Sequence, residues 1–251
     1  DYGLLVFSHS SGWMPAGGLE KPLSGGTRSI VMDDNVENGG STVRREMELS
    51  DFAAALPDGL FDFILFETCL TANVEVAYEL RNKADYIVAS AAEIVAPGFE
   101  ESYLNDTGYL LDTENNIEAN LIQFAQGYMR WCRNNYGGTI SVVKTQPLDE
   151  LAASVKAILA REMPVPAEFD NIQYFDRYAL YTPAYKRYFD LGKYIELAAT
   201  PEQLSAFAAI LDRTVVWEGH TATFMNGQGS GYKGINISTH CGLTVYAERA
   251  E

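Results

Sequence analysis

Two side chains with reactive chemistry follow two apolar, strand-like runs of the sequence. His9 comes just after the run 3–7, and Cys69 comes just after the run 61–66. Reactive groups in open α/β sheets collect at the carboxyl ends of strands, and neighbouring strands lie about 5 Å apart. If these strands are parallel neighbours, the imidazole and the thiol are within reach of each other. Such a pair supports acyl transfer through a thioester, with Cys69 as the nucleophile and His9 as the general base.

The groups next to this pair have predicted roles in the same chemistry. Apolar spacing predicts a helix over 72–83, and the positive end of its dipole, with a nearby imidazolium, would favour the thiolate of Cys69. The backbone N–H groups of Cys69 and Ser10 could hold an oxyanion. Ser90, at the end of the next strand, could line a substrate groove. The alternative for Ser90 is a polar cap on a strand end.

The elements that must position these residues alternate between strands and helices. Residues 10–46 are rich in Gly, Ser, Asn and charge, which predicts a long surface loop. The remaining chain predicts strands over 3–7, 61–66, 86–89 and 139–143, helices over 49–56, 116–134, 148–162, 187–199 and 201–216, and a strand or hairpin over 234–246. This alternation predicts an α/β fold with a mostly parallel sheet sandwiched by helices.

Length and charge narrow the class of protein. The chain has 251 residues, which fits a single domain over 1–251, with 163–251 as a C-terminal helical and strand sub-region of it. Its net charge is −16, from 18 Lys and Arg against 34 Asp and Glu. Because this charge repels phosphates, nucleic acid and anionic membranes are poor candidates as partners. No apolar run is long enough to predict a membrane span.

The other cysteines and histidines give weaker signals. The sequence has three cysteines, Cys69, Cys132 and Cys241. Their odd number and wide spacing argue against a disulfide framework. His220 and His240, the latter beside Cys241, could form a rival dyad or a metal pair. Adjacent ligands rarely face one ion and no further His or Cys cluster is present, so we expect no zinc and assign no metal ligands.

A calcium site is a weak possibility. The spacing Asp33-x-Asn35-x-Glu37 hints at a calcium loop. It lacks the Gly in the sixth place and the Glu in the twelfth that such loops use. We therefore expect chemistry that requires no cofactor, with calcium as the only candidate.

The sequence around the reactive pair also resembles a known family. Residues 3–13, GLLVFSHSSGW, resemble the histidine motif of the clostripain-like cysteine peptidases, and residues 61–70, FDFILFETCL, resemble their cysteine motif. The likeness continues over 74–81 and 84–90, with weaker similarity at 188–192 and 240–243. It spans most of the chain and is densest in the first hundred residues.

The resemblance implies a caspase-like fold with His9 and Cys69 as the catalytic dyad. It also implies cleavage of peptide or protein substrates after Arg or Lys, secretion by bacteria, maturation by self-cleavage and, in some relatives, dependence on calcium. The family's strands before the histidine motif are missing here and the chain begins with Asp. We therefore expect a piece of a longer precursor.

Three positions depart from the family pattern. Relatives have an Asp two residues before the cysteine that helps to bind the basic side chain, and Glu67 stands there, one methylene longer. Its carboxylate would bind a guanidinium in a bidentate, directional pairing. Ser10 replaces a common Gly after the histidine, and Thr68 replaces a small residue before the cysteine.

These departures leave more than one function open. The leading hypothesis is a cysteine endopeptidase that cleaves after basic residues. A second hypothesis is a peptidase-like protein that no longer cleaves and binds a partner at the bacterial surface. A third is a plain ligand-binding α/β domain in which the His and Cys are incidental.

Overall fold

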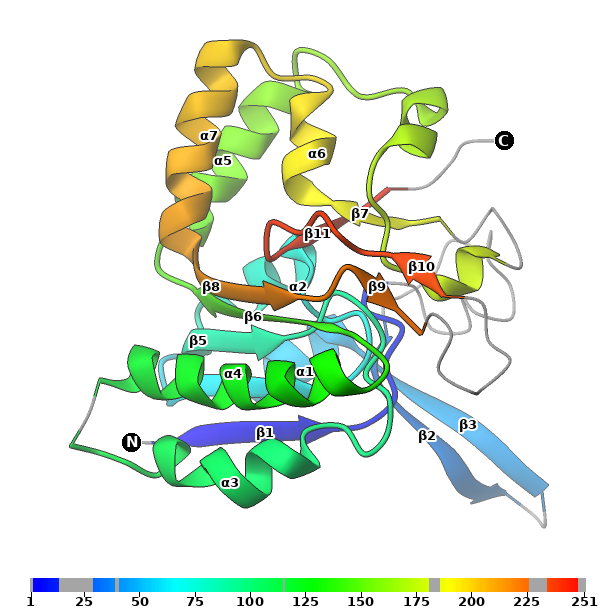
Figure 1. The fold of residues 1–251 in the computed structure, drawn as a ribbon, viewed down its shortest axis with the longest axis vertical. Helices are drawn as coiled ribbons and strands as arrows, with labels where there is room; N and C mark the ends of the chain where they lie inside the picture. Colours follow the sequence, from blue (N-terminus) through cyan, green and yellow to red (C-terminus); the bar gives the residue numbers. More distant parts are fainter. Residues whose placement is uncertain are drawn as a thin grey trace.

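A five-stranded sheet forms the centre of the computed structural model, which describes residues 2–13, 29–38, 41–114, 116–180, 186–225 and 234–247 (Figure 1). Its strands lie in the order β1 (Gly3–Phe7), β4 (Phe61–Glu67), β5 (Ala84–Ala89), β6 (Thr139–Lys144) and β8 (Val215–His220). The first three are parallel, and β6 is antiparallel to both of its neighbours. Four of the five strands therefore run in one direction, which confirms the predicted mostly parallel sheet.

Helices cover both faces of this sheet (Figure 1). One face packs against α3 (Glu100–Leu110) and α4 (Ile117–Asn134). The other face packs against α1 (Leu49–Ala55), α2 (Val74–Glu79), α5 (Leu148–Leu159), α6 (Leu191–Glu196) and α7 (Pro201–Thr214). The sandwich explains why the run around β4 is continuously apolar, since strands in such sheets are buried on both faces.

Strand β4 shows this two-sided burial residue by residue. Ile64 and Phe66 belong to the apolar cluster on one face, and Phe63 and Leu65 belong to the cluster on the other. Successive side chains of a strand point to opposite faces, so the positions from Phe63 to Phe66 are all buried against helices. None of the helices in the described ranges is long and apolar enough to cross a membrane.

Two paired β-strands replace the described C-terminal part of the predicted loop over 10–46. β2 (Ser29–Asn38) and β3 (Ser41–Glu48) pair in antiparallel fashion with two irregularities in register. The loop prediction is therefore wrong from residue 29 onward, while residues 14–28 lie outside the described part. The two strands are rich in charge and pair with each other, so they carry little of the apolar signal that marks a buried strand.

The C-terminal third contains short strands that pair with remote partners. The predicted helix over 187–199 is instead β7 (Tyr188–Asp190) followed by α6. β11 (Thr244–Tyr246) pairs with β7, and β10 (Ile235–Asn236) pairs with β9 (Thr223–Phe224). The predicted hairpin over 234–246 is therefore wrong, because its two halves pair with other strands. Two 3-10 helices, Pro166–Asn171 and Arg177–Leu180, precede β7.

Candidate active site

The register of β1 on β4 places the two reactive residues side by side. Five pairs run from Gly3 opposite Phe63 to Phe7 opposite Glu67. His9 and Cys69 each lie two residues beyond that last pair, at the same carboxyl edge. β1 and β4 are thus parallel neighbours, as the sequence predicted.

His9 and Cys69 open onto one cavity of about 460 Å³. Its walls come from the ends of β1 and β4, from β2, and from the loop after β5. The lining residues are Phe7, Ser8, His9, Met32, Asp33, Glu67, Thr68, Cys69, Ile94, Ala96, Pro97 and Gly98. A concave, largely apolar space with a few polar groups is typical of a ligand site, and here those groups include an imidazole, a thiol and two carboxylates.

The hairpin strand β2 holds the His9 segment in place. The Met32 backbone N–H donates to the His9 carbonyl at 3.0 Å. The Ser8 hydroxyl donates to the Met32 carbonyl at 2.9 Å. A segment predicted to be a loop thus forms a wall of the cavity. The candidate calcium ligands of 33–37 lie on this same strand, where its register is irregular, and calcium binding there stays a prediction.

The Cys69 thiol is in a poorly solvated place. Burial is the main cause that raises the pKa of Cys69 to about 11, and the nearby charge of Glu93 adds to it. Helix α2 begins at Val74, five residues beyond Cys69, so its N-terminus does not lie at the thiol. The prediction of a favoured thiolate is therefore wrong for this conformation, and the thiol is protonated at neutral pH.

The residue after the thiol has an uncommon backbone conformation. Leu70 has a φ of 59°, in the left-handed region that few non-glycine residues adopt. Its carbonyl accepts a hydrogen bond from the Asn73 side chain at 2.9 Å, and its N–H donates to the Ala92 carbonyl at 3.1 Å. A conformation of this kind costs roughly 1–3 kcal/mol and is found most often at functional sites.

Gly12 lets the loop after His9 pack against the loop after Cys69. Its φ is +67°, and a Cβ at this position would clash with the Leu70 carbonyl. The Tyr188 hydroxyl donates to the neighbouring Ser11 carbonyl, which ties the His9 loop to β7. The two loops that carry the dyad therefore touch each other through backbone atoms.

Ser10 does not need the left-handed region. The non-glycine residues with positive φ in the described part are Leu70 and Met225, so the replacement of Gly by Ser creates no such strain. The Ser10 hydroxyl accepts a hydrogen bond from the Gly12 N–H at 2.9 Å. This side chain is buried in its own turn, and the oxyanion role of the backbone N–H groups of Ser10 and Cys69 stays a prediction.

Glu67 is held firmly at the cavity wall. It is buried, and its Oε1 accepts a hydrogen bond from the Phe99 N–H at 3.0 Å. Its carboxylate also hydrogen-bonds Tyr103, which together with burial raises the pKa of that phenol. A side chain at Gly98 would clash with Glu67. The carboxylate thus has a fixed position beside the thiol, as binding of a cation would require.

Comparison with protein families decides the relationship. A model of the clostripain family matches residues 1–226. The chain belongs to the clostripain family. A search of curated proteins finds no match.

Solved structures of related proteases share the fold. One is an inactive zymogen C11 protease from Parabacteroides distasonis, 28% identical, with a TM-score of 0.78 over 99% of this chain and 64% of that one. Another is a secreted C11 cysteine protease from Bacteroides thetaiotaomicron in complex with an irreversible peptide inhibitor, 25% identical, with a TM-score of 0.74 over 100% of this chain and 67% of that one. The sheet and its helices match these proteases, so the predicted caspase-like fold is confirmed.

Ser90 lies in the interior of this clostripain-family chain. It is fully buried, and its hydroxyl donates to the Ala92 carbonyl at 3.0 Å. Ser90 also hydrogen-bonds the Thr139 hydroxyl at 3.0 Å, which joins the end of β5 to β6. The alternative of a polar cap on a strand end fits these contacts, and the groove-lining prediction does not.

The sequence analysis missed Glu93, which lies close to the thiol. Burial, followed by the charge of Asp176, raises the pKa of Glu93 to about 8. Its Oε1 lies 3.6 Å from the Arg177 Nε. An acidic residue four positions after the end of a strand is the signal that could have pointed to it. Once Glu93 ionises, its charge adds to the burial that raises the pKa of the Cys69 thiol.

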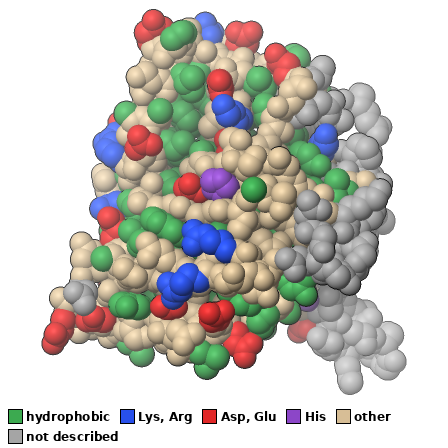
Figure 2. All heavy atoms as spheres, viewed as in Figure 1, with side chains coloured by type: hydrophobic (Ala, Val, Ile, Leu, Met, Phe, Trp, Pro, Cys, Tyr) green, Lys and Arg blue, Asp and Glu red, His purple; other side chains and the backbone are tan. Residues whose placement is uncertain are grey.

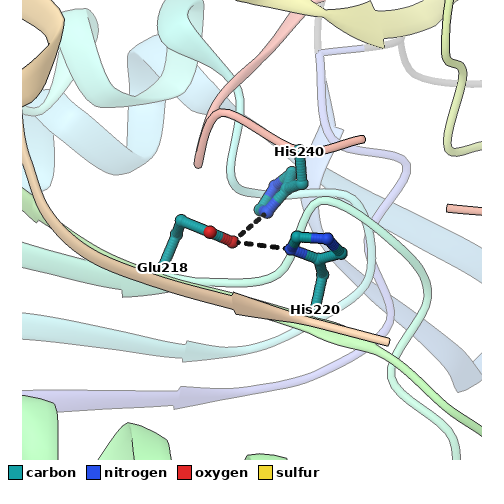
Figure 3. A group of neighbouring side chains, drawn as sticks. All are labelled: Glu218, His220 and His240. Carbon is teal, nitrogen blue, oxygen red and sulfur yellow. Dashed lines mark hydrogen bonds and ion pairs between the residues drawn. The ribbon is translucent and has the colours of Figure 1, made fainter. Parts of the chain in front are cut away.

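The rival dyad of His240 and Cys241 is not formed. The Cys241 thiol donates to the Leu243 carbonyl at 3.2 Å, and the His240 Nδ1 lies 3.1 Å from the Glu218 Oε2. His220 also lies beside Glu218, an acid that was not among the predicted site residues (Figure 3). Glu218 precedes His220 by two positions, so a period of two on a strand was the signal for this pair.

Proposed function

We propose that this clostripain-family protein is a cysteine endopeptidase that cleaves peptide bonds after Arg or Lys. The observation that carries the proposal is the placement of His9 and Cys69 at the ends of paired parallel strands, facing one cavity with two carboxylates. Family membership and the likeness to a protease described with a peptide inhibitor support it. Cys69 is the nucleophile and His9 the general base.

The neutral thiol sets the order of events in the proposed mechanism. His9 takes the thiol proton as the Cys69 sulfur attacks the scissile carbonyl carbon, because the thiol does not ionise at rest. The carbonyl oxygen becomes an oxyanion, which the backbone N–H groups of Ser10 and Cys69 would stabilise. His9 then gives its proton to the leaving amine, and the thioester forms. A water molecule, deprotonated by His9, hydrolyses the thioester.

Two carboxylates explain the proposed preference for a basic residue. Glu67 and Asp33 both line the cavity. A guanidinium can pair with a carboxylate through two parallel hydrogen bonds, which is stronger and more directional than an ammonium contact. Because Glu67 is fixed by Phe99 and Tyr103, we expect Arg to be preferred over Lys.

A set of fluorogenic peptides that differ only in the residue before the cleaved bond tests the proposal. Peptides ending in Arg and Lys should be hydrolysed, and the Asp peptide should not, because its carboxylate would meet Asp33 and Glu67. Cys69→Ala is the matched control for a contaminating protease. Equal hydrolysis of the Asp and Arg peptides would contradict the specificity, and silence on every peptide would contradict the enzyme.

The alternative function is binding without cleavage, and the neutral Cys69 thiol is the observation that favours it. Such a protein would bind an Arg-ending peptide at the same cavity but release it intact. Fluorescence anisotropy of a labelled peptide, followed by mass spectrometry of the same sample, separates the two functions. Intact peptide after prolonged binding would support the binding protein.

Localisation and cofactor follow from the same proposal. We infer a bacterial, secreted protein, since the protease with the peptide inhibitor is described as secreted and comes from Bacteroides thetaiotaomicron. The proposed acyl transfer uses side chains and backbone groups alone. Adding calcium or a calcium chelator to the peptide assay tests whether the metal has a part in it.

A further inference from the structure

Strand β8 places an acid and a histidine on one face at an edge of the sheet. Glu218 and His220 are two positions apart, so their side chains point the same way. β8 is the outer strand beyond β6, and it pairs with no other strand of this sheet. The side chains of Glu218 and His220 are 31% and 26% exposed. Figure 2 shows histidine atoms beside acidic atoms near the middle of this face.

His240 completes a three-residue cluster from a different part of the chain. It lies between β10 and β11, and its side chain is fully buried. The Nδ1 atoms of His220 and His240 lie 2.9 Å and 3.1 Å from the same oxygen, Glu218 Oε2. Figure 3 shows the two rings directed at the carboxylate from β8 and from the loop. One donor atom from each residue lies within 4.8 Å of the other two.

The hydrogen bonds of His220 leave a lone pair facing the carboxylate. His220 Nε2 lies 3.3 Å from the Ser238 carbonyl, which can only accept, so this nitrogen carries a proton. In the neutral ring, Nδ1 is then unprotonated and lies 2.9 Å from a carboxylate oxygen. Two acceptors at that distance need a cation between them, either a second proton or a metal ion. A histidine whose other N–H donates to a backbone carbonyl is also the usual arrangement of a metal ligand.

His240 is free to present the same nitrogen. Its Nε2 is buried and has no hydrogen-bond partner among the described residues. Without a metal, the Glu218 carboxylate favours the proton on Nδ1. A metal ion at Nδ1 would displace that proton to Nε2, where no described group holds a competing proton. Two imidazole nitrogens and one carboxylate oxygen then converge from two segments.

We propose that Glu218, His220 and His240 form a zinc site. Two histidines and one carboxylate with an open fourth position for water are a donor set that zinc uses. Tetrahedral zinc with bonds of about 2.0–2.1 Å separates its ligand atoms by roughly 3.3 Å, so the two nitrogen–oxygen distances need to open by only a few tenths of an ångström. Imidazole donors favour zinc over calcium or magnesium, which prefer oxygen.

The site joins the sheet edge to the segment that supports the nucleophile loop. Beyond His240 the chain reaches β11, where the Thr244 N–H donates to the Ala72 carbonyl at 2.9 Å. Ala72 lies three residues after Cys69. Zinc at β8 would thus fasten the support of the Cys69 loop to the central sheet.

Zinc titration of a metal-free Cys69→Ala protein tests the site. The substitution removes the thiol, so zinc bound between Cys69 and His9 cannot imitate the result. Isothermal titration calorimetry should give one zinc ion per chain, and zinc should raise the melting temperature. Cobalt in its place should give the visible absorption bands of a tetrahedral site.

Changes at the ligands make the test specific. His220→Asn and Glu218→Gln, placed in the Cys69→Ala background, should each weaken zinc binding by at least about tenfold. Glu150→Gln, a surface acid on α5, is the matched control and should leave binding unchanged. Circular dichroism checks that each variant folds. If one of the two ligand variants does not fold, the other still tests the site.

Two results would overturn the zinc site. One is the absence of stoichiometric binding to the Cys69→Ala protein. The other is binding that neither ligand substitution weakens. In both cases the second proton is the cation, and the cluster is an imidazolium paired with Glu218.

Discussion

The two edges of the central sheet carry similar side chains but form different kinds of site. At β1, His9 and a thiol from the end of the neighbouring parallel strand line one cavity of about 460 Å³. At β8, His220 meets a carboxylate from its own strand and a second histidine from a loop, and three donor atoms converge. A histidine at a strand end is therefore not informative by itself. The groups around the histidine determine whether the site has space for a substrate or for a metal ion.

Removal of either member of the dyad is expected to have the largest effect. Cys69→Ala should abolish hydrolysis of an Arg peptide because no acyl acceptor remains, and His9→Ala should lower kcat by about 10²–10⁴-fold because the neutral thiol loses its base. Steady-state kinetics with a fluorogenic peptide measures both. Cys132→Ala, a buried thiol on α4, is the matched control. Full activity of His9→Ala would remove the β1 edge from the chemistry.

The ionisation of Cys69 should be displaced to high pH in the resting protein. Burial raises the pKa of the Cys69 thiol to about 11 from 9.0. Alkylation by iodoacetamide should therefore be slow at neutral pH and rise with an apparent pKa near 11. Because the folded-state pKa is the higher one, this burial favours folding fully below about pH 9, and the contribution is lost as the pH rises through about 11. Mass spectrometry of the Cys69 peptide at a series of pH values measures the rate.

A plateau of fast alkylation at neutral pH would contradict that prediction. It would show a resting thiolate and a conformation in which the Cys69 thiol is not buried as described. Cys241 offers an internal comparison, since burial also raises the pKa of its thiol.

Loss of the Glu67 charge should weaken cleavage after Arg selectively. Glu67→Gln should lower kcat/KM for the Arg peptide, since a charged hydrogen bond becomes a neutral one. The decrease should correspond to a loss of about 1–3 kcal/mol of transition-state stabilisation. Glu118→Gln, an acid on α4 away from the cavity, is the matched control. Kinetics on Arg and Lys peptides distinguishes a lost pocket from a general defect. An unchanged kcat/KM would remove Glu67 from the pocket.

The contact between the two dyad loops should appear as a difference between glycine substitutions. Gly12→Ala and Gly59→Ala both place a side chain at positive φ, at a cost of about 1–2 kcal/mol. Only Gly12 would also clash with a backbone carbonyl, which should add about 1–3 kcal/mol. Urea unfolding measures both variants. Equal losses would show that the His9 and Cys69 loops do not pack as described.

Local patterns in the sequence were sufficient to predict the central elements of the fold. β4, β5 and β6 are apolar runs, and α4 and α5 carry apolar stripes, so each reveals its own burial. β1 is also an apolar run, although Leu5 and Phe7 are exposed at the edge of the sheet. The reactive pair could be predicted because His9 and Cys69 follow two such runs directly.

The parts that were missed depend on remote pairing. The hairpin of β2 and β3 is rich in charge, and β7 and β11 are three residues each and are defined by pairing with each other. α3 has an irregular pattern with Gly108 within it. Glu218 was missed because its neighbour His240 reaches it only through the tertiary fold. The chain spans 64% of the length of the Parabacteroides distasonis protease.

The most direct measurement is covalent labelling with a peptide that ends in an arginyl chloromethyl ketone, followed by peptide mapping. The proposed active site predicts one adduct per chain on Cys69, no adduct in Cys69→Ala, and much slower labelling in His9→Ala. A reagent that ends in Asp should label Cys69 poorly. Labelling at Cys132 or Cys241, or labelling of Cys69 that is indifferent to His9 and to the terminal residue, would contradict the assignment of the dyad and its pocket.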